Sequence, residues 1–243
     1  MLKGLPIGRE DFKEIRENSF YYVDKTKYIE ELLLDGTQVK LFCRPRRFGK
    51  TLSMSTLRYF FDIKNGEENR KLFDGLYISN SPMMSEQGKY PVIFISMKGV
   101  TGHTWKSSFS DIKLKIKELF KDYSYLVDSF DKYDKLDFEK YILDIESLEE
   151  ADLKKSLHIL TKLLCKYYNQ KVILLICPQV LDSHSNACGR FNLSHHTISK
   201  SQFSRHGELL LLFNQLVLFN FKLASLVICQ FLFQVASIVF FLR

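Results

Sequence analysis

The first 176 residues alternate between helix-like and strand-like patterns of hydrophobic positions. Apolar residues recur at helical spacing in the segments 24–34, 51–62, 109–123 and 153–168. Three shorter runs, 39–43, 91–97 and 171–176, are β-prone and largely apolar. Continuous apolar strands separated by helices predict an α/β fold, with a parallel sheet flanked by helices on both faces. The acidic and aromatic stretch 122–150 is predicted to be a helical insert.

The composition of the chain changes sharply after Ile176. Residues 177–243 hold five of the 35 basic and two of the 28 acidic residues, which leaves 30 and 26 for residues 1–176. All 12 tyrosines also precede this point. We therefore divide the chain into a domain over residues 1–176 and an atypical tail over 177–243, which is strongly apolar from about residue 209.

The overall composition is that of a folded protein. Hydrophobic residues make up 46% of the chain and charged residues 26%, which excludes wholesale disorder. The net charge of +7 permits contact with phosphates without requiring it. Five cysteines, odd in number and not closely paired, do not form a disulfide framework. Because residues 1–11 contain no long apolar run, a cytoplasmic location is expected.

The loop after the first predicted strand carries the clearest chemical signal. Residues 44–52 read Arg-Pro-Arg-Arg-Phe-Gly-Lys-Thr-Leu. Gly49, Lys50 and Thr51 match the last three positions of the phosphate-binding (Walker A) pattern G-x-x-x-x-G-K-[ST]. Arg44 stands where that pattern has its first glycine. Placed between a strand and a helix, this loop predicts a nucleotide site.

Each predicted site residue has a role in holding ATP and Mg²⁺. Lys50 would reach the β- and γ-phosphates, and the Thr51 hydroxyl would be a ligand of Mg²⁺. Backbone N–H groups at the start of the helix would point at the phosphates. The predicted binding residues are Arg46, Arg47, Phe48, Gly49, Lys50, Thr51 and Leu52. The same cations also fit a solvated basic loop or a nucleic-acid contact, although residues 1–176 show no extended basic track.

Several motifs in the same order resemble the predicted AAA-ATPase-like family. In that family an Arg-Pro-Arg-Arg-Phe run precedes Gly-Lys-Thr, so Arg44 agrees with the family pattern. Further matching runs are Leu5 to Gly8, Tyr21 to Thr26, Leu72 to Leu76 and Lys89 to Phe94. The resemblance covers essentially all of residues 1–176. It implies a P-loop NTPase fold that binds ATP with Mg²⁺, often joined to a nuclease-like domain to which nothing in this chain corresponds.

The resemblance stops where the family has an acidic motif. In the family the third strand ends in a run similar to Asp-Glu-Tyr-Asp, which helps to hold Mg²⁺ and orients the attacking water. Here the strand is followed by Cys177-Pro178-Gln179-Val180. We therefore expect ATP binding without effective turnover, and we assign no catalytic residue.

The strand order implied by the family raises a second expectation. In P-loop ATPases of this type the order is usually 5-1-4-3-2, so a fourth strand lies between the first and third. Residues 1–176 contain only three strand-like runs. Either the tail supplies the missing strand or the domain is incomplete, with unpaired backbone groups that cost stability. Residues 1–176 alone are expected to be marginally stable or prone to aggregation.

Three interpretations of the tail remain open. Residues 223–242 are 20 residues without charge, long enough for a membrane-spanning helix, although Gln230 and Gln234 interrupt it. A divergent domain is the second interpretation, and translation that is out of frame or derived from an intron is the third. For the function of the protein, the first hypothesis is an ATP-binding AAA-ATPase-like domain. The alternatives are a nucleic-acid-binding or nuclease-associated module, and a protein tethered to a membrane through residues 223–242.

Overall fold

The computed structural model describes residues 3–43, 48–100, 104–177 and 236–242 of the chain. Its α-helices are α1 (Phe12–Glu17), α2 (Lys27–Leu34), α3 (Lys50–Phe61), α4 (Gly66–Arg70), α5 (Trp105–Lys121), α6 (Lys132–Leu143) and α7 (Glu150–Tyr168). The strands are β1 (Val39–Cys43), β2 (Val92–Ser96), β3 (Val172–Cys177) and β4 (Ala236–Leu242). Short 3₁₀ segments are η1 (Ile63–Asn65), η2 (Lys71–Phe73), η3 (Tyr77–Asn80), η4 (Pro82–Glu86) and η5 (Ser124–Ser129).

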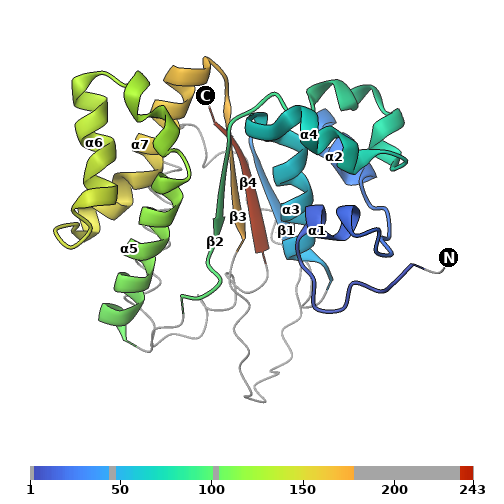
Figure 1. Ribbon diagram of the computed structural model, residues 1–243, viewed down its shortest axis with the longest axis horizontal. Coiled ribbons are helices and arrows are strands. Elements are labelled where there is room, and N and C mark those ends of the chain that lie inside the picture. Colours follow the sequence, from blue (N-terminus) through green and yellow to red (C-terminus); the bar gives the residue numbers. More distant parts are fainter. Residues whose placement is uncertain (1–2, 44–47, 101–103, 178–235, 243) are drawn as a thin grey trace.

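The four strands form one sheet in the order β1-β4-β3-β2. β2 and β3 are parallel, with Val92 opposite Ile173 and Ser96 opposite Cys177. β4 is antiparallel to both of its neighbours, so β1 and β3 run in the same direction on either side of it. Figure 1 shows the sheet nearly edge-on between two groups of helices, with α1–α4 on one side and α5–α7 on the other.

The predicted α/β fold and helix-flanked sheet are confirmed. Each strand predicted in residues 1–176 is present within one or two residues of its expected ends, and the insert over 122–150 contains η5 and α6. One feature differs from the predicted parallel sheet, since β4 runs against the other three strands. Hydrophobic pattern places a strand in a sheet but does not set its direction, which depends on the end from which the chain enters.

A strand from the tail occupies the place between β1 and β3, although it runs antiparallel to both. Val39 to Cys43 pair with Phe240 to Ala236, and Val172 to Ile176 pair with Leu242 to Ile238. The sheet is therefore continuous from β1 to β2, and β1 and β3 both have a hydrogen-bonded neighbour. This strand also occupies the last seven residues of the membrane-span candidate 223–242, whose other residues lie outside the described part. Among the described residues, no helix is both long and apolar enough to span a membrane.

Alternate residues of β2 and β3 face the two helical layers. Val92, Ile173, Leu175 and Cys177 belong to the core beneath α1–α4, which we call the loop-side core because α3 follows the predicted phosphate loop. Its largest wholly buried side chains are Phe12, Phe60, Phe61 and Phe73. Phe60 contacts both Phe61 and Phe73 edge to face, with ring centroids 5.1 and 5.3 Å apart.

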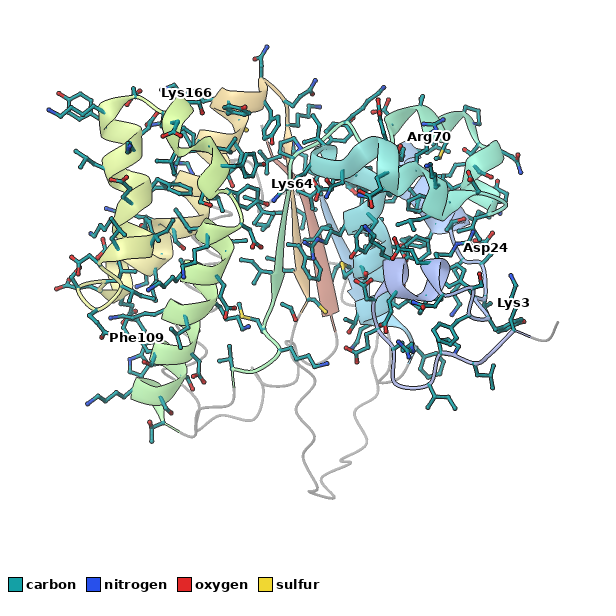
Figure 2. All side chains as sticks on the ribbon, viewed as in Figure 1. Lys3, Asp24, Lys64, Arg70, Phe109 and Lys166 are labelled. Atoms are coloured by element: carbon teal, nitrogen blue, oxygen red, sulfur yellow. The ribbon has the colours of Figure 1, made fainter. Side chains whose placement is uncertain are left out.

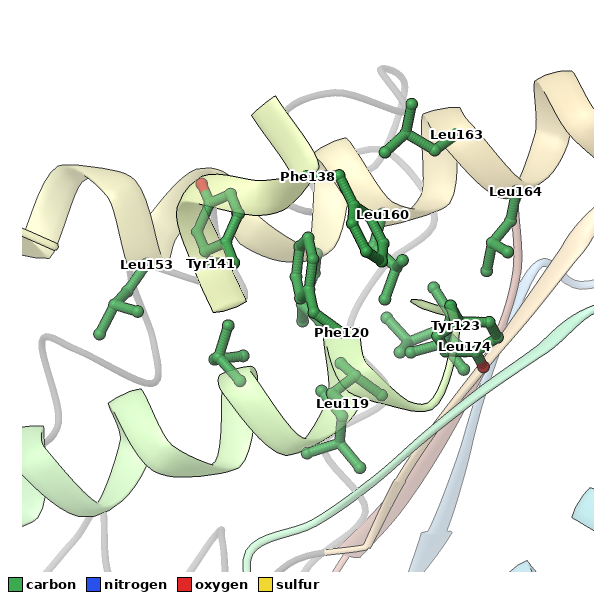
Figure 3. Packing of buried hydrophobic residues seen from close by; sticks show 14 of the residues in the cluster. Leu119, Phe120, Tyr123, Phe138, Tyr141, Leu153, Leu160, Leu163, Leu164 and Leu174 are labelled. Carbon is green, nitrogen blue, oxygen red and sulfur yellow. The ribbon is translucent and has the colours of Figure 1, made fainter. Parts of the chain in front are cut away.

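The opposite face carries a separate core beneath α5–α7, which we call the far-side core. Ile93, Ile95, Val172, Leu174 and Ile176 contribute to it from the sheet. Figure 3 shows Phe120 of α5 between Phe138 and Tyr141 of α6, against the leucines of α7. Phe120 and Tyr141 are stacked with centroids 4.4 Å apart. This apolar packing fixes α5–α7 as a cover on the sheet.

Candidate functional site

The predicted loop leads from the end of β1 into the start of α3, as its sequence pattern requires. β1 ends at Cys43, and α3 begins at Lys50 after an N-cap residue, Gly49. No side chain caps the first turn of α3. Because the first N–H groups of a helix lack partners within the helix, this turn can donate hydrogen bonds to an anion.

Gly49 is required at the N-cap by its backbone conformation. Its φ of 73° and ψ of 28° lie in the left-handed region. A Cβ atom built there would have no atom within 4 Å, so space does not exclude a side chain. The backbone conformation disfavours a side chain, because a positive φ costs residues other than glycine conformational energy. The glycine of the Gly-Lys-Thr motif thus turns the chain sharply into the helix.

The predicted binding residues differ widely in exposure. Lys50 is buried at 7% exposure, Thr51 and Leu52 are half-buried, and Phe48 is 60% exposed. Leu52 packs against the loop-side core, so its side chain serves the fold. Arg46 and Arg47 lie outside the described residues, as does Arg44. The structure therefore brings together Gly49, Lys50 and Thr51 at the start of α3.

The end of β3 meets the start of α3. The Cys177 thiol lies 3.7 Å from the Thr51 hydroxyl oxygen, within reach of a weak sulfur hydrogen bond. Cys177 is 3% exposed and is the last residue of its strand. A residue at this position therefore faces the predicted Mg²⁺ ligand. In this chain it offers a neutral thiol, whereas Mg²⁺ prefers oxygen ligands.

A hydrogen-bond network around Asp11 holds α3 against α1. Asp11 caps α1 by accepting from the backbone N–H of Glu14 at 3.0 Å. Its other carboxylate oxygen accepts from the hydroxyls of Ser55 and Tyr59, at 3.0 and 3.1 Å. Ser55 also accepts from the backbone N–H of Phe12 at 2.9 Å. These directional bonds fix both the position and the rotation of α3.

Burial and the nearby Asp11 carboxylate raise the pKa of Tyr59 to about 12. The Tyr59 hydroxyl therefore stays protonated at neutral pH and keeps its role as a donor to Asp11.

A second contact anchors the first turn of α3 directly. The Tyr28 hydroxyl in α2 donates to the backbone carbonyl of Ser53 at 2.8 Å. The Tyr28 ring also packs edge to face on Phe42 of β1, with centroids 6.0 Å apart. One side chain thus ties together the strand before the loop and the helix after it. This arrangement fixes the distance that the loop must cross.

The Tyr-Tyr-Val-Asp-Lys-Thr run at residues 21–26 has a structural role. Asp24 accepts hydrogen bonds from the Thr26 backbone and hydroxyl, at 2.8 and 2.7 Å, and from the Tyr77 backbone at 2.6 Å. Burial acts to raise the pKa of Asp24, but these hydrogen bonds outweigh it and hold the pKa below its usual range. The run fastens the start of α2 to η3. Thr26 is the N-cap residue of α2, and its side chain makes no capping hydrogen bond to that helix.

Sequence reasoning missed Asp11, Ser55 and Tyr59 as residues that support the site. A weak signal existed, since Ser55 and Tyr59 are four residues apart and therefore share one face of a helix. Their common partner, Asp11, lies more than 40 residues away in the chain. Only the packing of α1 on α3 identifies it.

The residues at the start of α3 fit a nucleotide better than they fit a metal ion. An uncapped helix start, a lysine and a glycine in the left-handed conformation suit the oxygens of a polyphosphate. For Mg²⁺ the described residues offer the Thr51 hydroxyl, while the neighbouring strand end carries the Cys177 thiol in place of a carboxylate. Bound Mg²⁺ would neutralise phosphate charge. Its contact with the protein would be the Thr51 hydroxyl, and its other contacts would be with the phosphates.

Comparisons with known proteins relate the sequence of this chain to a family. A protein from Azotobacter chroococcum mcd 1, described as an uncharacterized protein in the vnfD 5' region, is 42% identical over 98 residues. That match covers 40% of this chain and only 17% of the relative, so the chain spans a small part of its length. No solved structure matches the chain. The family model described as predicted AAA-ATPase matches residues 6–178, more than half of the 243 residues. The chain therefore belongs to the predicted AAA-ATPase family.

Proposed function

We propose that this protein binds ATP at the start of α3 and hydrolyses it very slowly. The observation that carries the proposal is the arrangement of Gly49, Lys50 and Thr51. A glycine in the left-handed conformation leads into a helix without a side-chain cap. The first two residues of that helix are a lysine and a threonine. Membership of the predicted AAA-ATPase family supports the same assignment. Arg46 and Arg47 are proposed to add positive charge beside the phosphates.

Slow turnover is inferred from the residue opposite Thr51. Hydrolysis of the γ-phosphate needs a group that orients the attacking water and carboxylate support for the metal. The Cys177 thiol, 3.7 Å from the Thr51 hydroxyl, supplies neither. ATP affinity then rests on the phosphate contacts, with Lys50 as the main cation. The protein would then be a domain that binds ATP without hydrolysing it at an appreciable rate.

Nucleotide binding by the full chain tests the proposal directly. Lys50→Ala should weaken binding of ATP at least about tenfold, because hydrogen bonds from a charged donor are worth about 1.5–3 kcal/mol. Lys106→Ala is the matched control, since Lys106 is an exposed lysine on α5. Titration calorimetry with Mg-ATP measures both. Equal affinity in wild type and Lys50→Ala would refute the site, provided that circular dichroism shows the variant folded.

A variant that adds a carboxylate beside Thr51 tests the proposed roles of this position in Mg²⁺ binding and in hydrolysis. Cys177→Asp places a carboxylate beside Thr51 and should make ATP affinity more dependent on Mg²⁺ than in the wild type. Cys177→Ser is the control, because it changes polarity without adding charge. Phosphate release by both variants should stay low, since neither adds a group that orients water. Rapid release by the unmodified chain would contradict the proposal.

The nucleic-acid function remains a separate proposal with a separate readout. In this proposal Arg46 and Arg47 bind the phosphates of DNA or RNA. Replacing both with alanine would then abolish salt-sensitive binding of duplex DNA and leave ATP affinity nearly unchanged. If the wild type does not bind DNA and the double variant binds ATP more weakly than the wild type, the arginines belong to the nucleotide site.

A further inference from the structure

One edge of the sheet is open beside a cavity that the proposed ATP site does not use. β2 pairs with β3 on one side and is the last strand of the described sheet on the other. A cavity of about 280 Å³ lies along it, between the second half of α3 and the second half of α5. Figure 1 shows β2 at this edge, between the two helical layers.

The hydrogen-bonding direction of each β2 residue follows from its pairing with β3. The N–H of Ile173 donates to Pro91, and the N–H of Met97 donates to Cys177, at 2.9 and 3.0 Å. In a parallel pair, alternate residues turn both backbone groups to the same neighbour. Residues 91, 93, 95 and 97 therefore face β3, whereas the backbone groups of Val92, Phe94 and Ser96 face the open edge.

The protein already covers the first part of this edge with its own chain. Just before β2, residues 61–63 lie parallel to Tyr90, which donates to the Phe61 carbonyl and accepts from the Ile63 N–H, at 3.0 and 2.9 Å. The Tyr123 hydroxyl then donates to the carbonyl of Val92. This cover ends at Val92, and the cavity lines the strand from there to Ser96.

The cavity contains a guanidinium group with unused donors. Arg58 stacks over the Phe94 ring at 5.2 Å and lies 5.9 Å from the Tyr59 ring. Within the described ranges its side chain makes no hydrogen bond or ion pair, although its charge acts on the neighbouring Asp62. Each of the two lysines that line the cavity has a hydrogen-bond partner. Lys115 pairs with Glu118 at 3.0 Å, and Lys64 donates to the Asp122 carbonyl at 3.1 Å.

Figure 2 places Lys64 beside the upper end of β2, where the covered part of the edge lies. Lys64 also sits over the Tyr125 ring at 4.8 Å, which holds its ammonium group in place. Lys64 keeps its charge, but these two contacts hold it at the covered end of the edge, whereas the charge of Lys115 is balanced by Glu118. Arg58 is therefore the cation of this cavity that is best placed to bind a carboxylate, which it can do with two parallel hydrogen bonds.

We propose that the open edge of β2 binds an extended strand of a partner protein, and that an acidic side chain of that strand pairs with Arg58. The outward backbone groups of Phe94 and Ser96 would hydrogen-bond the incoming main chain, as in β-strand addition. The outward backbone groups of the edge and the charge of Arg58 favour this occupant. A space of about 280 Å³ accommodates one or two side chains of a docked strand.

A display library of random peptides, screened against the immobilised full chain, tests the proposal. Recovered peptides should be rich in β-branched residues and carry an aspartate or glutamate. Arg58→Glu should weaken their binding at least about tenfold, because it reverses the charge that meets the carboxylate. Lys106→Glu makes the same charge change on an exposed residue of α5 and should leave binding unchanged.

Ser96→Pro tests the backbone contacts independently. It removes an N–H that faces outward, and proline is tolerated at such positions of edge strands. Binding should be lost while circular dichroism and ATP affinity remain as in the wild type. Peptides that bind wild type and Arg58→Glu equally, or a library that yields none preferring the wild type over Ser96→Pro, would overturn the proposal. A concentration-dependent dimer abolished by Ser96→Pro would identify a second copy of the chain as the occupant and would also overturn it.

Discussion

Both faces of the sheet bury an apolar core beneath their helices, but only the loop side adds directional hydrogen bonds around the start of a proposed site. On the loop side, polar side chains fix α3 through specific hydrogen bonds, with Asp11, Ser55, Tyr59 and Tyr28 as the main participants. On the far side, α5–α7 are held by a continuous apolar and aromatic core. The difference matches their roles. A helix whose first turn must meet a ligand needs a fixed position, which directional bonds provide, whereas a cover needs only burial.

The largest effect is expected from removing the central aromatic ring of the far-side core. Phe120 is wholly buried and contacts Phe138 and Tyr141. Phe120→Ala should lower the free energy of unfolding by about 3–5 kcal/mol, measured by urea denaturation of the full chain. At temperatures where the variant is folded, its ATP affinity should equal that of the wild type. A loss of affinity in the folded variant would show that the cover also positions the site.

An intermediate effect is expected from the network around Asp11. Ser55→Ala removes the hydroxyl that bonds Asp11 and leaves the buried N–H of Phe12 without its acceptor. The free energy of unfolding should fall by about 1–3 kcal/mol. Unlike Phe120→Ala, this variant should also weaken ATP binding, because α3 loses a positional restraint.

Tyr59→Phe sharpens the same test. It deletes one hydroxyl and keeps the ring, so the packing of α3 is preserved. If the two residues act as one network, the double variant should lose less stability than the sum of the single variants. Strict additivity would show that Ser55 and Tyr59 act independently. The measurement is a double-mutant cycle with urea denaturation of all four proteins.

The smallest effect is expected at the surface of the far side. Asp131 caps α6 and pairs with Lys166 at 2.6 Å. The Asp134 N–H and then Lys166 lower the pKa of Asp131 from 3.8 to about 2. Since the pKa is depressed in the folded state, this contribution to stability is present above about pH 3.8 and is lost as the pH falls through 2.

Asp131→Asn removes this titration and keeps a good capping residue. Thermal unfolding from pH 5 to 2 should therefore depend slightly less on pH in the variant than in the wild type. Its ATP affinity at neutral pH should be unchanged, because α6 belongs to the cover. An unaltered pH profile would show that the exposed pair contributes nothing measurable.

The hydrophobic pattern predicted most of the fold because burial leaves a local trace. The strands predicted at 39–43, 91–97 and 171–176 are present. In the predicted helix 51–62, Leu57, Phe60 and Phe61 are wholly buried. Gly49 lies between β1 and α3, and Lys50 and Thr51 are the first residues of that helix, because glycine and helix-start chemistry are local. Their binding of ATP remains a prediction. The strand at 236–242 was missed, since its apolar run looks the same whether it crosses a membrane or fills a sheet.

The sequence by itself determined the α/β class, the strand-to-helix loop with its glycine, lysine and threonine, and the change of composition after Ile176. Only the tertiary structure decided which groups meet across long separations in the chain. It joined Asp11 to Ser55 and Tyr59, brought Cys177 to Thr51, and inserted Ala236–Leu242 between β1 and β3. The physical reason is that local patterns record which faces are buried, whereas partner and direction are selected when the sheet and helices pack together.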